Sequence, residues 1–594
     1  MSYRRKKLLA LFCATALSMT AVAGCTGTKS STGNVVSSET EVNAKETVAQ
    51  SETGTFSSAD MFTERDLAGT YEESGAVYVT LSGDGITGET DGVAINGQTV
   101  TITAEGTYIF SGTLSEGQIV VDADKAKVQI VFDNVDITCA SSAAVYVKNA
   151  EKVFVTLAEG AQNTLRNTDE YVAIDDNNID AVIFAKSDLT LNGTGSLTII
   201  SAEGHGIVSK DDLKIIGGTY DIIAAGHALS GKDSVRIADG TFILTAEKDG
   251  IHAENADDEE KGYIYIADGD FTITSDGDGM DASNIVQIED GTLDITAGGG
   301  AANSLKTHES DVPGGPGGGM PQNGEKLDGE SMPQMGEKPD GENMPQDTTT
   351  DESGTSTKGI KAGGGMYLNG GTYQIDSADD SIHSNANITI ADGTYTLATG
   401  DDGVHADDAL IVNGGTITVT ESYEGLEGLA VTINDGTIDI TASDDGINTA
   451  GEKMELNGGY IHILAGGDGV DSNGDLTING GEIYIDGPSD NGNSAIDYGD
   501  RSSAYVNGGT LVAIGSSGMA EVMSDSSKQK VLMVKLGEQM EAGNVVLTDS
   551  EGNVIVSYTA LKTYDCVIIS TAEVESGATY TLTTSGTTTE VTAE

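Results

Sequence analysis

A short motif returns along this chain at a nearly constant interval. Each copy is an apolar run followed by a turn that ends in glycine, as in "VNGGTI" around Gly415. The spacing is 22 residues from Gly371 to Gly393 and again from Gly393 to Gly415. The turn glycines are Gly218, Gly240, Gly269, Gly291, Gly371, Gly393, Gly415, Gly436, Gly459, Gly481 and Gly509. Such a period is typical of repeat proteins, whose units bury their apolar faces only against their neighbours.

One period contains three short segments with the alternation of a half-buried strand. Leu410 and Val412 flank an outward residue, and Ile417 and Val419 repeat this pattern after an Asn-Gly-Gly turn. The third segment lies within "DDGVHADD", where His405 points away from its two apolar neighbours. Stacked periods pair each strand with its copy, and parallel crossovers are right-handed. The repeat therefore predicts an all-β protein, a right-handed parallel β-helix with about 22 residues per coil.

The period defines the expected domains. We expect the β-helix to occupy residues 59–519 and to carry a disordered insertion rich in Gly, Pro and Met at about 299–357. Beyond residue 520 the apolar alternation continues without the 22-residue spacing. Residues 520–594 are therefore predicted to form a small antiparallel β cap.

The first residues have the pattern of an export signal. Residues 1–25 join a basic start to a short apolar stretch, and the last four resemble the lipobox of a bacterial lipoprotein. This resemblance implies a lipid on Cys25, and residues 26–58 have the composition of a disordered tether. We expect an extracellular protein, anchored to the cell membrane only through this lipid. Ordinary cleavage, which would give a free secreted protein, is the alternative.

Charge excludes several classes of partner. The formal net charge is −64, from 94 acidic and 30 basic residues, which argues against nucleic acid and against an anionic membrane surface. The four cysteines give no pattern of a disulfide framework or a thiolate metal site. We expect a monomer.

Paired aspartates recur at the corner before the third strand of several periods. Stacking places them about 4.8 Å apart, where carboxylates repel one another unless a cation lies between them. Calcium accepts six to eight oxygen ligands, so we predict calcium as the cofactor. The ligands predicted from this stacking are Asp379, Asp380, Asp401, Asp402, Asp444, Asp445 and Asp468. The alternative is that these residues are solvated acidic turns.

Three residues after an acidic or basic corner residue, a further polar side chain occupies the outward position of the strand. His252, His383, His405 and Asn448 take this place, and we expect them to hydrogen-bond to the carboxylates or to a ligand. Zinc is a possible ion for the histidines, but the oxygen-rich surroundings favour calcium.

Three consecutive stretches are "HGIVSKDDLKIIGGTYDI" (205–222), "HALSGKDSVRIADGTF" (227–242) and "KDGIHAEN" (248–255). These and other stretches resemble a family of secreted carbohydrate-binding proteins from anaerobic, plant-fibre-degrading Firmicutes. The resemblance implies a right-handed parallel β-helix similar to pectate lyases that binds calcium and acidic plant polysaccharide such as polygalacturonate. The further calcium ligands implied by the likeness to the pectate lyase site are Asp278, Asp281 and Asp471, with Asp468.

Three functions follow from these features. The first is a cell-surface protein that holds acidic polysaccharide through calcium and is not an enzyme. The second is a calcium-dependent polysaccharide lyase, whose base would be Lys361, in the outward place that His405 takes in its own period. Lys361 is alternatively a counter-ion of the acidic corners. The third function is a non-catalytic adhesin or surface stalk.

Overall fold

The computed structural model describes residues 56–306 and 356–593, apart from the single residues 84, 89, 256 and 500. The described residues belong to one compact unit. The export signal, Cys25 and nearly all of the predicted tether lie outside the described residues, as does most of the predicted insertion, so these assignments stay predictions. Among the described residues, no helix has the length and apolar character needed to cross a membrane.

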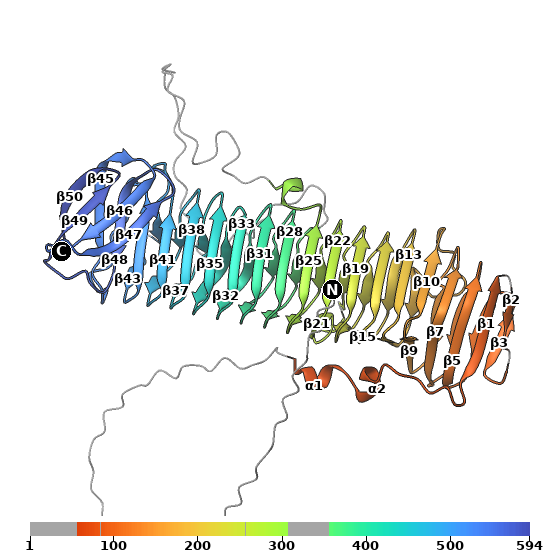
Figure 1. Cartoon of the computed structure of the whole chain (residues 1–594). Helices are drawn as coiled ribbons and strands as arrows, with labels where there is room; N and C mark the ends of the chain where they lie inside the picture. The colour runs from red at the N-terminus through yellow and green to blue at the C-terminus, as the bar shows by residue number, and fades with distance from the viewer. Residues whose placement is uncertain are drawn as a thin grey trace, which may run out of the picture. The chain divides into compact units, whose positions relative to one another are not determined.

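Strands make up most of the described chain, and the majority belong to one long, mainly parallel sheet (Figure 1). Through most of the repeat region, a strand pairs with the strand three places later in the chain, which is one period on. The all-β class and the parallel pairing predicted from the repeat are thereby confirmed. The pairing divides the repeat into three ladders.

The first ladder is formed by the strands that follow the turn glycines. Its strands are β10 (Gln162–Asn167), β13 (Ser196–Ser201), β16 (Thr219–Ala224), β19 (Thr241–Ala246), β22 (Asp270–Ser275), β25 (Thr292–Ala297), β28 (Thr372–Ser377), β31 (Thr394–Thr399), β33 (Thr416–Glu421), β35 (Thr437–Ala442), β38 (Tyr460–Ala465), β41 (Glu482–Asp486) and β44 (Thr510–Gly515).

The second ladder carries the outward polar residues of the sequence motif. Its strands are β6 (Gln118–Asp122), β8 (Val145–Asn149), β11 (Ala181–Ala185), β14 (His205–Ser209), β17 (Leu229–Gly231), β20 (Ile251–Ala253), β23 (Met280–Ala282), β26 (Ile360–Ala362), β29 (Ile382–Ser384), β32 (Val404–Val412), β34 (Leu426–Ile433), β36 (Ile447–Thr449), β39 (Val470–Ser472) and β42 (Ile496–Tyr498).

The third ladder precedes the turn glycines and shares the long strands β32 and β34 with the second. Its other strands are β9 (Lys152–Leu157), β12 (Asp188–Gly193), β15 (Asp212–Ile215), β18 (Ser234–Ile237), β21 (Tyr263–Ile266), β24 (Val286–Ile288), β27 (Met366–Leu368), β30 (Ile388–Ile390), β37 (Met454–Leu456), β40 (Leu476–Ile478) and β43 (Ala504–Val506).

Both ends of the ladders contain antiparallel pairs. At the first end β1 pairs with β2 and β3 with β4, and at the second end β44 pairs with β48. The strands of the first end are β1 (Val77–Gly83), β2 (Gly85–Thr87), β3 (Val93–Asn96), β4 (Thr99–Ile102), β5 (Gly106–Leu114) and β7 (Lys127–Thr138). Those of the second end are β45 (Leu532–Met540), β46 (Gly543–Thr548), β47 (Val554–Ala560), β48 (Tyr564–Ser570), β49 (Thr579–Thr584) and β50 (Thr587–Thr592).

Apolar side chains from all three ladders form one continuous hydrophobic cluster. In-register pairing stacks like residues on like: Phe242 lies with its ring centroid 4.7 Å from that of Phe271, and Tyr373 lies 4.5 Å from Tyr395. Burial of each large apolar side chain contributes about 1.5–3 kcal/mol. The repeated apolar positions therefore supply the main stabilisation, as the sequence pattern predicts.

Steric constraints explain why glycine occurs at the turns. Gly415 has a φ of 89°, and a Cβ atom there would lie 2.8 Å from the carbonyl oxygen of Gly393 in the preceding coil. An L-residue side chain would therefore meet both backbone strain and a clash with the neighbouring coil. This explains why glycine returns at this position.

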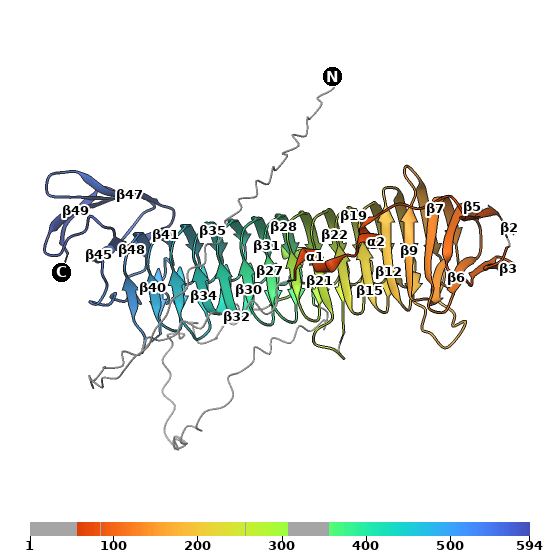
Figure 2. The ribbon, with the colours of Figure 1, turned by 90° about the horizontal axis from the view of Figure 1, so that it is seen from below.

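A short segment before the ladders packs along one of their faces (Figure 2). It contains the helices α1 (Ser58–Met61) and α2 (Glu64–Leu67), and a 3-10 helix, η1 (Ala301–Asn303), occurs later in the chain. Asp66 of α2 is fully buried, and its carboxylate lies 2.6 Å from Nζ of Lys152 and accepts a hydrogen bond from the Thr190 hydroxyl. Burial opposes ionisation, but the hydrogen bonds from Lys152, Thr63 and Thr190 lower the pKa of Asp66 to about 2.

The substitution Asp66→Asn should lower the stability by about 3 kcal/mol at pH 7, because it leaves a buried lysine without its partner. The folded pKa lies below the ordinary value of 3.8, so this contribution is complete above about pH 4 and is lost toward pH 2. Thermal unfolding at pH 7 and at pH 2.5 measures both effects. Asp60→Asn, at an exposed position of α1, is the control. An equal deficit of Asp66→Asn at both pH values would contradict this account.

Candidate functional site

The second ladder places polar side chains from successive coils in two columns. The outward column consists of the middle residues of its short strands, which pair in register from one coil to the next. Its members are His252, Asp281, Lys361, His383, His405, Glu427, Asn448, Asp471 and Asp497. The corner column lies three residues earlier in each coil. Its members are Asp249, Asp278, Lys358, Asp380, Asp402, Glu424, Asp445, Asp468 and Ser494.

Most corner carboxylates perform a structural task. The amide N–H of Asp278 donates to Oδ1 of Asp249 at 2.9 Å, and that of Asp468 donates to Oδ1 of Asp445 at 2.6 Å. The amide of Glu424 donates in the same way to Oδ1 of Asp402 at 3.2 Å. Each such aspartate satisfies a backbone donor in the next coil, while its second oxygen stays available for another partner. The acidic corners thus stabilise the coil whether or not they bind a metal.

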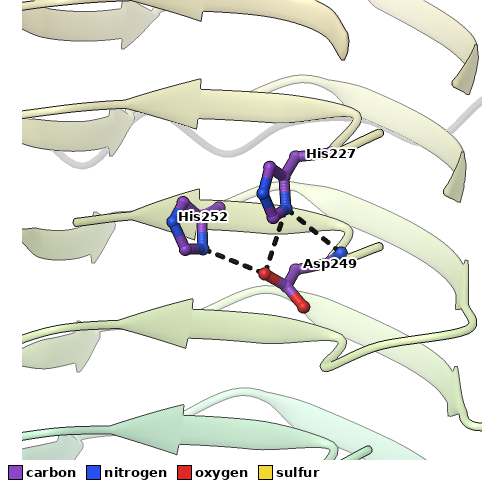
Figure 3. Close-up of side chains that lie close together, drawn as sticks. All are labelled: His227, Asp249 and His252. Carbon is purple, nitrogen blue, oxygen red and sulfur yellow. Dashed lines mark hydrogen bonds and ion pairs between the residues drawn. The ribbon is translucent and has the colours of Figure 1, made fainter. Parts of the chain in front are cut away.

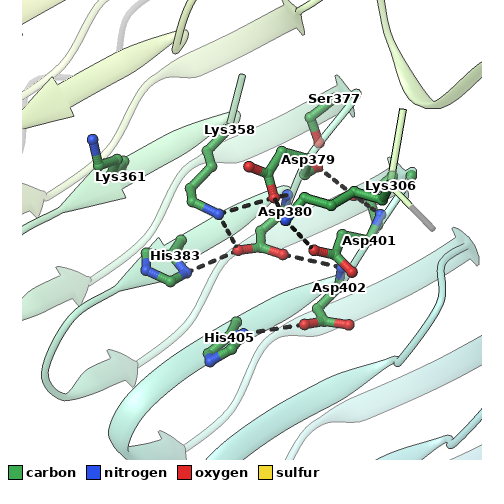
Figure 4. A network of polar contacts seen from close by, with 12 residues as sticks. Lys306, Lys358, Lys361, Ser377, Asp379, Asp380, His383, Asp401, Asp402 and His405 are labelled. Carbon is green, nitrogen blue, oxygen red and sulfur yellow. Dashed lines mark hydrogen bonds and ion pairs between the residues drawn. The ribbon is translucent and has the colours of Figure 1, made fainter. Parts of the chain in front are cut away.

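Two lysines neutralise the acids in the middle of the corner column (Figure 4). Nζ of Lys358 lies 2.9 Å from Oδ1 of Asp379 and 2.5 Å from Oδ2 of Asp380. Nζ of Lys306 lies 3.1 Å from Oδ1 of Asp379 and 2.8 Å from Oδ2 of Asp401. The structure brings these three predicted calcium ligands together, but around ammonium groups. An ammonium group here performs the charge compensation that the sequence analysis assigned to calcium.

Lys361 is a counter-ion in this structure. Its Nζ lies 3.5 Å from Oδ2 of Asp278 and 3.3 Å from Oδ1 of Asp281, the two aspartates matched to the pectate lyase site. Burial opposes its charge, but Asp278 and Asp281 raise the pKa of Lys361 above its ordinary value. A lysine with a raised pKa keeps its proton at neutral pH, so the amine in this setting is not a base.

Two predicted histidines contact carboxylates. Nδ1 of His383 lies 2.8 Å from Oδ2 of Asp380, and Nδ1 of His405 lies 3.1 Å from both Asp402 and Glu427. Burial opposes the charge of His405, but its carboxylate neighbours raise the pKa of His405 to about 12. A protonated His405 therefore serves Asp402 and Glu427 as a further built-in cation.

The later part of the two columns has the donor set of a calcium site. Asp445, Asp468 and Asp471 each offer an oxygen, and these atoms lie within 4.8 Å of one another. Burial first, and neighbouring carboxylates second, raise the pKa of Asp445 to about 8, of Asp468 to about 7 and of Asp471 to about 6. Asp444 is one of the charges that raise all three. In the described part of the chain, no lysine or arginine forms an ion pair with these three acids.

Asn448 supplies a second, independent sign of a ligand. Its Nδ2 group donates to Oε2 of Glu424 at 2.9 Å, while its Oδ1 atom is buried and has no hydrogen-bond donor. Asn448 stands in the outward column between Glu427 and Asp471. A buried amide oxygen without a donor costs stability unless water or a cation satisfies it. A donor set made only of carboxylate and amide oxygens fits calcium.

The first part of the columns is different again, because histidines replace the acids (Figure 3). His227 precedes Asp249 in the corner position, and Nδ1 of His227 and Nδ1 of His252 lie 3.0 Å and 2.9 Å from Oδ2 of Asp249. Burial opposes the charge of His252, but Asp249 raises the pKa of His252. The predicted residue His252 therefore belongs to a histidine cluster, and its Nδ1 also lies 3.6 Å from Oδ2 of Asp281 in the next coil.

Sequence reasoning missed several members of these columns. The motif consists of an ionisable residue, glycine, an apolar residue and an outward polar residue. It also covers "EGLE" at 424–427, so one additional coil lies between those of Asp402 and Asp445. The sequence motif did not point to His227, because the corresponding residues of its coil are "HALS", without the glycine of the motif. No sequence signal pointed to Lys306 either, since it lies within the predicted insertion and contacts Asp379 only in three dimensions.

Comparison with known proteins identifies relatives. The family model described as "Carbohydrate-binding domain-containing protein" matches residues 96–403 and 401–553. A carbohydrate-binding domain-containing protein of Acetivibrio thermocellus is 41% identical over 135 residues, which are 22% of this chain and 47% of that protein. The match thus spans less than half of that relative. A solved polysaccharide lyase-like protein from C. thermocellum, a gadolinium derivative, is 36% identical with a TM-score of 0.37 and covers 38% of this chain and 92% of its own.

The substitution Lys358→Met should destabilise the protein by about 3 kcal/mol, because it leaves the buried Asp380 without its ammonium partner and Asp379 with Lys306 alone. Calcium in millimolar amounts should restore part of this loss, since it supplies the missing positive charge. Thermal unfolding with chelator and with calcium measures both effects. Lys453→Met is the matched control, because Lys453 pairs with Glu455 at an exposed position. A variant as stable as the parent would show that the ammonium group is not needed.

Proposed function

Because this chain belongs to the family of carbohydrate-binding domain-containing proteins, we propose that it binds acidic plant polysaccharide of the polygalacturonate kind through calcium ions. The carbohydrate-binding family expected from the resemblance is confirmed by the match of the family model. Calcium, secretion, the acidic nature of the ligand and the likeness to pectate lyases are parts of the proposal.

The observation that carries the proposal is the group of carboxylate oxygens at Asp445, Asp468 and Asp471. One buried and two half-buried carboxylates converge there, and Asn448, which pairs with Asp471 in the ladder, has an amide oxygen that lacks a donor. A divalent cation held by these oxygens would keep open positions, which a carboxylate of a uronate chain can occupy. The residues present therefore fit calcium as the group that joins protein and polymer.

The overall charge favours such a bridge. A chain of net charge −64 repels a polyanion, and a cation bound between the two carboxylate surfaces removes this repulsion. Successive coils repeat acidic groups along the columns, so a long polymer can contact several weak sites at once. We therefore infer a binding surface along the second ladder.

The proposal includes the closed form of the fold and its place on the cell. We infer that the three ladders close into a right-handed coil, since parallel crossovers have that hand in nearly all proteins. We also infer that Cys25 carries a lipid which holds the domain outside the cell. A lyase is the weaker alternative, because the proposed base Lys361 is paired with Asp278 and Asp281. An adhesin or stalk would bind no polysaccharide at this surface.

Replacing Asp445, Asp468 and Asp471 by Asn should abolish calcium-dependent binding of polygalacturonate, because the bridge loses its charged ligands. Isothermal calorimetry with polygalacturonate in calcium and in chelator provides the measurement. The matched control is Asp221→Asn, Asp270→Asn and Asp294→Asn, which removes the same charge from exposed positions of the first ladder. Unchanged binding by the first variant would show that other residues hold the polymer.

Calcium affinity should increase with pH between 6 and 8. The pKa values of Asp445, Asp468 and Asp471 are about 8, 7 and 6, all raised above the ordinary value of 3.8. Without calcium, these carboxyl groups therefore lose their protons between pH 6 and pH 8, and their ionisation lowers the stability of the folded protein. Calcium binds only the ionised carboxylates and therefore displaces their protons. For each proton released, the calcium affinity increases by about tenfold per pH unit. Calorimetry in buffers of different ionisation enthalpy counts the protons. An affinity independent of pH would contradict the assignment.

A further inference from the structure

One cavity in this acidic chain has an unusual lining. Its volume is about 380 Å³, within the range of small-molecule sites, and it lies beside the second ladder at β14, β17 and β20. The basic residues that line it are His205, His227, His252, Lys210, Lys232 and Lys248. Glu254 and Asp257 line it too. Three lysines against two acids make a positive surplus, opposite in sign to the charge of the chain.

A backbone hydrogen bond determines which nitrogen of His205 carries the proton. The amide of His227 donates to Nδ1 of His205 at 2.9 Å, and burial lowers the pKa of His205 to about 3. A nitrogen that accepts an N–H carries no hydrogen of its own, so the proton of this neutral ring is on Nε2. Nδ1 of His227 instead faces both the amide of Asp249 at 3.2 Å and its Oδ2 at 3.0 Å. The ring of His205 thus offers an Nε2–H donor.

The rings are stacked in a fixed orientation. The centroids of His205 and His227 lie 4.9 Å apart, and those of His227 and His252 lie 4.1 Å apart, with interplanar angles of 3° and 13°. In Figure 3 the second nitrogens of His227 and His252 point away from Asp249. These histidines line the cavity, so their ring nitrogens are held in place before any ligand binds.

The lysines of the cavity are weakly engaged. Lys232 lies 3.2 Å from Asp257 in an exposed ion pair, a type that contributes little. Lys210 lies over the ring of Phe184 at 5.4 Å. Among the described residues, Lys248 and Lys210 have no ion pair with a carboxylate. Their ammonium groups are therefore available to an anion.

We propose that this cavity is an anion subsite that binds the carboxylate of a uronate sugar directly, without calcium. Lys210, Lys248 and the Nε2–H of His205 are the donors to the carboxylate. The proposal rests on the proposed function, since it assigns a second contact to the same acidic polysaccharide. It adds a site of opposite character to the acidic group of Asp445, Asp468 and Asp471.

The histidine cluster could also hold a transition metal, because ligand atoms of His227, Asp249 and His252 lie within 4.8 Å of one another. Nδ1 of His227 and Nδ1 of His252, however, both already lie against Oδ2 of Asp249, at 3.0 Å and 2.9 Å. The lysines beside the cluster also repel a dication. The geometry therefore favours an anion, and a metal is the rival outcome of the test.

The test is the binding of trigalacturonate in excess chelator, measured by calorimetry or ligand-observed NMR. The parent should bind it, and Lys210→Gln with Lys248→Gln should weaken binding by about tenfold, the effect of losing two charge-assisted contacts. The matched control, Lys125→Gln with Lys528→Gln, removes the same charge from exposed positions and should stay within about twofold of the parent. A neutral trisaccharide should show no difference between the variants.

Two results would overturn the proposal. If the parent binds no trigalacturonate in chelator but binds polygalacturonate in calcium, the subsite is refuted while the proposed function stands. If zinc restores binding that chelator removed, and His227→Gln abolishes this recovery, the cluster is a metal site. Equal binding by the lysine variant and its control would also refute the subsite.

Discussion

In-register pairing of each strand with its copy one coil later is the constraint on which the rest of the structure depends. It stacks apolar residues into one continuous core and brings turn glycines such as Gly415 against the backbone of the preceding coil. The same pairing aligns residues three positions apart in every motif into a corner column and an outward column. Any charge at these positions must therefore be compensated by its neighbours along the ladder.

The described chain compensates these charges in two ways. At Asp379 and Asp380 the counter-ions are lysines, Lys306 and Lys358. At Asp402 a histidine has this role. Asp468 has no such partner among the described residues, and in the same ladder an oxygen of Asn448 is unsatisfied. A row of similar motifs thus contains chemically distinct segments.

Much of the fold follows from the sequence, because the period and the alternation report burial directly. The sequence pattern of a single period is enough to predict the turn glycines and the outward place of His405. Repetition of that pattern predicts the parallel pairing. The partners of the acids are not local. Lys306 contacts Asp379 across 73 residues of chain, and the hydrogen bond from the amide N–H of Asp278 to the carboxylate of Asp249 depends on the stacking of two coils. A list of candidate acids is therefore predictable from the motif, whereas their pairing with lysine, histidine or a metal ion depends on the three-dimensional arrangement.

The position of bound calcium tests the central claim most directly. Anomalous diffraction from crystals grown in calcium chloride would locate the ions without any substitution. The account predicts an ion coordinated by Asp445, Asp468 and Asp471, and no ion at Asp379 and Asp380, where Lys358 already lies. Calcium at Asp379 and Asp380 with none at Asp468 would contradict it.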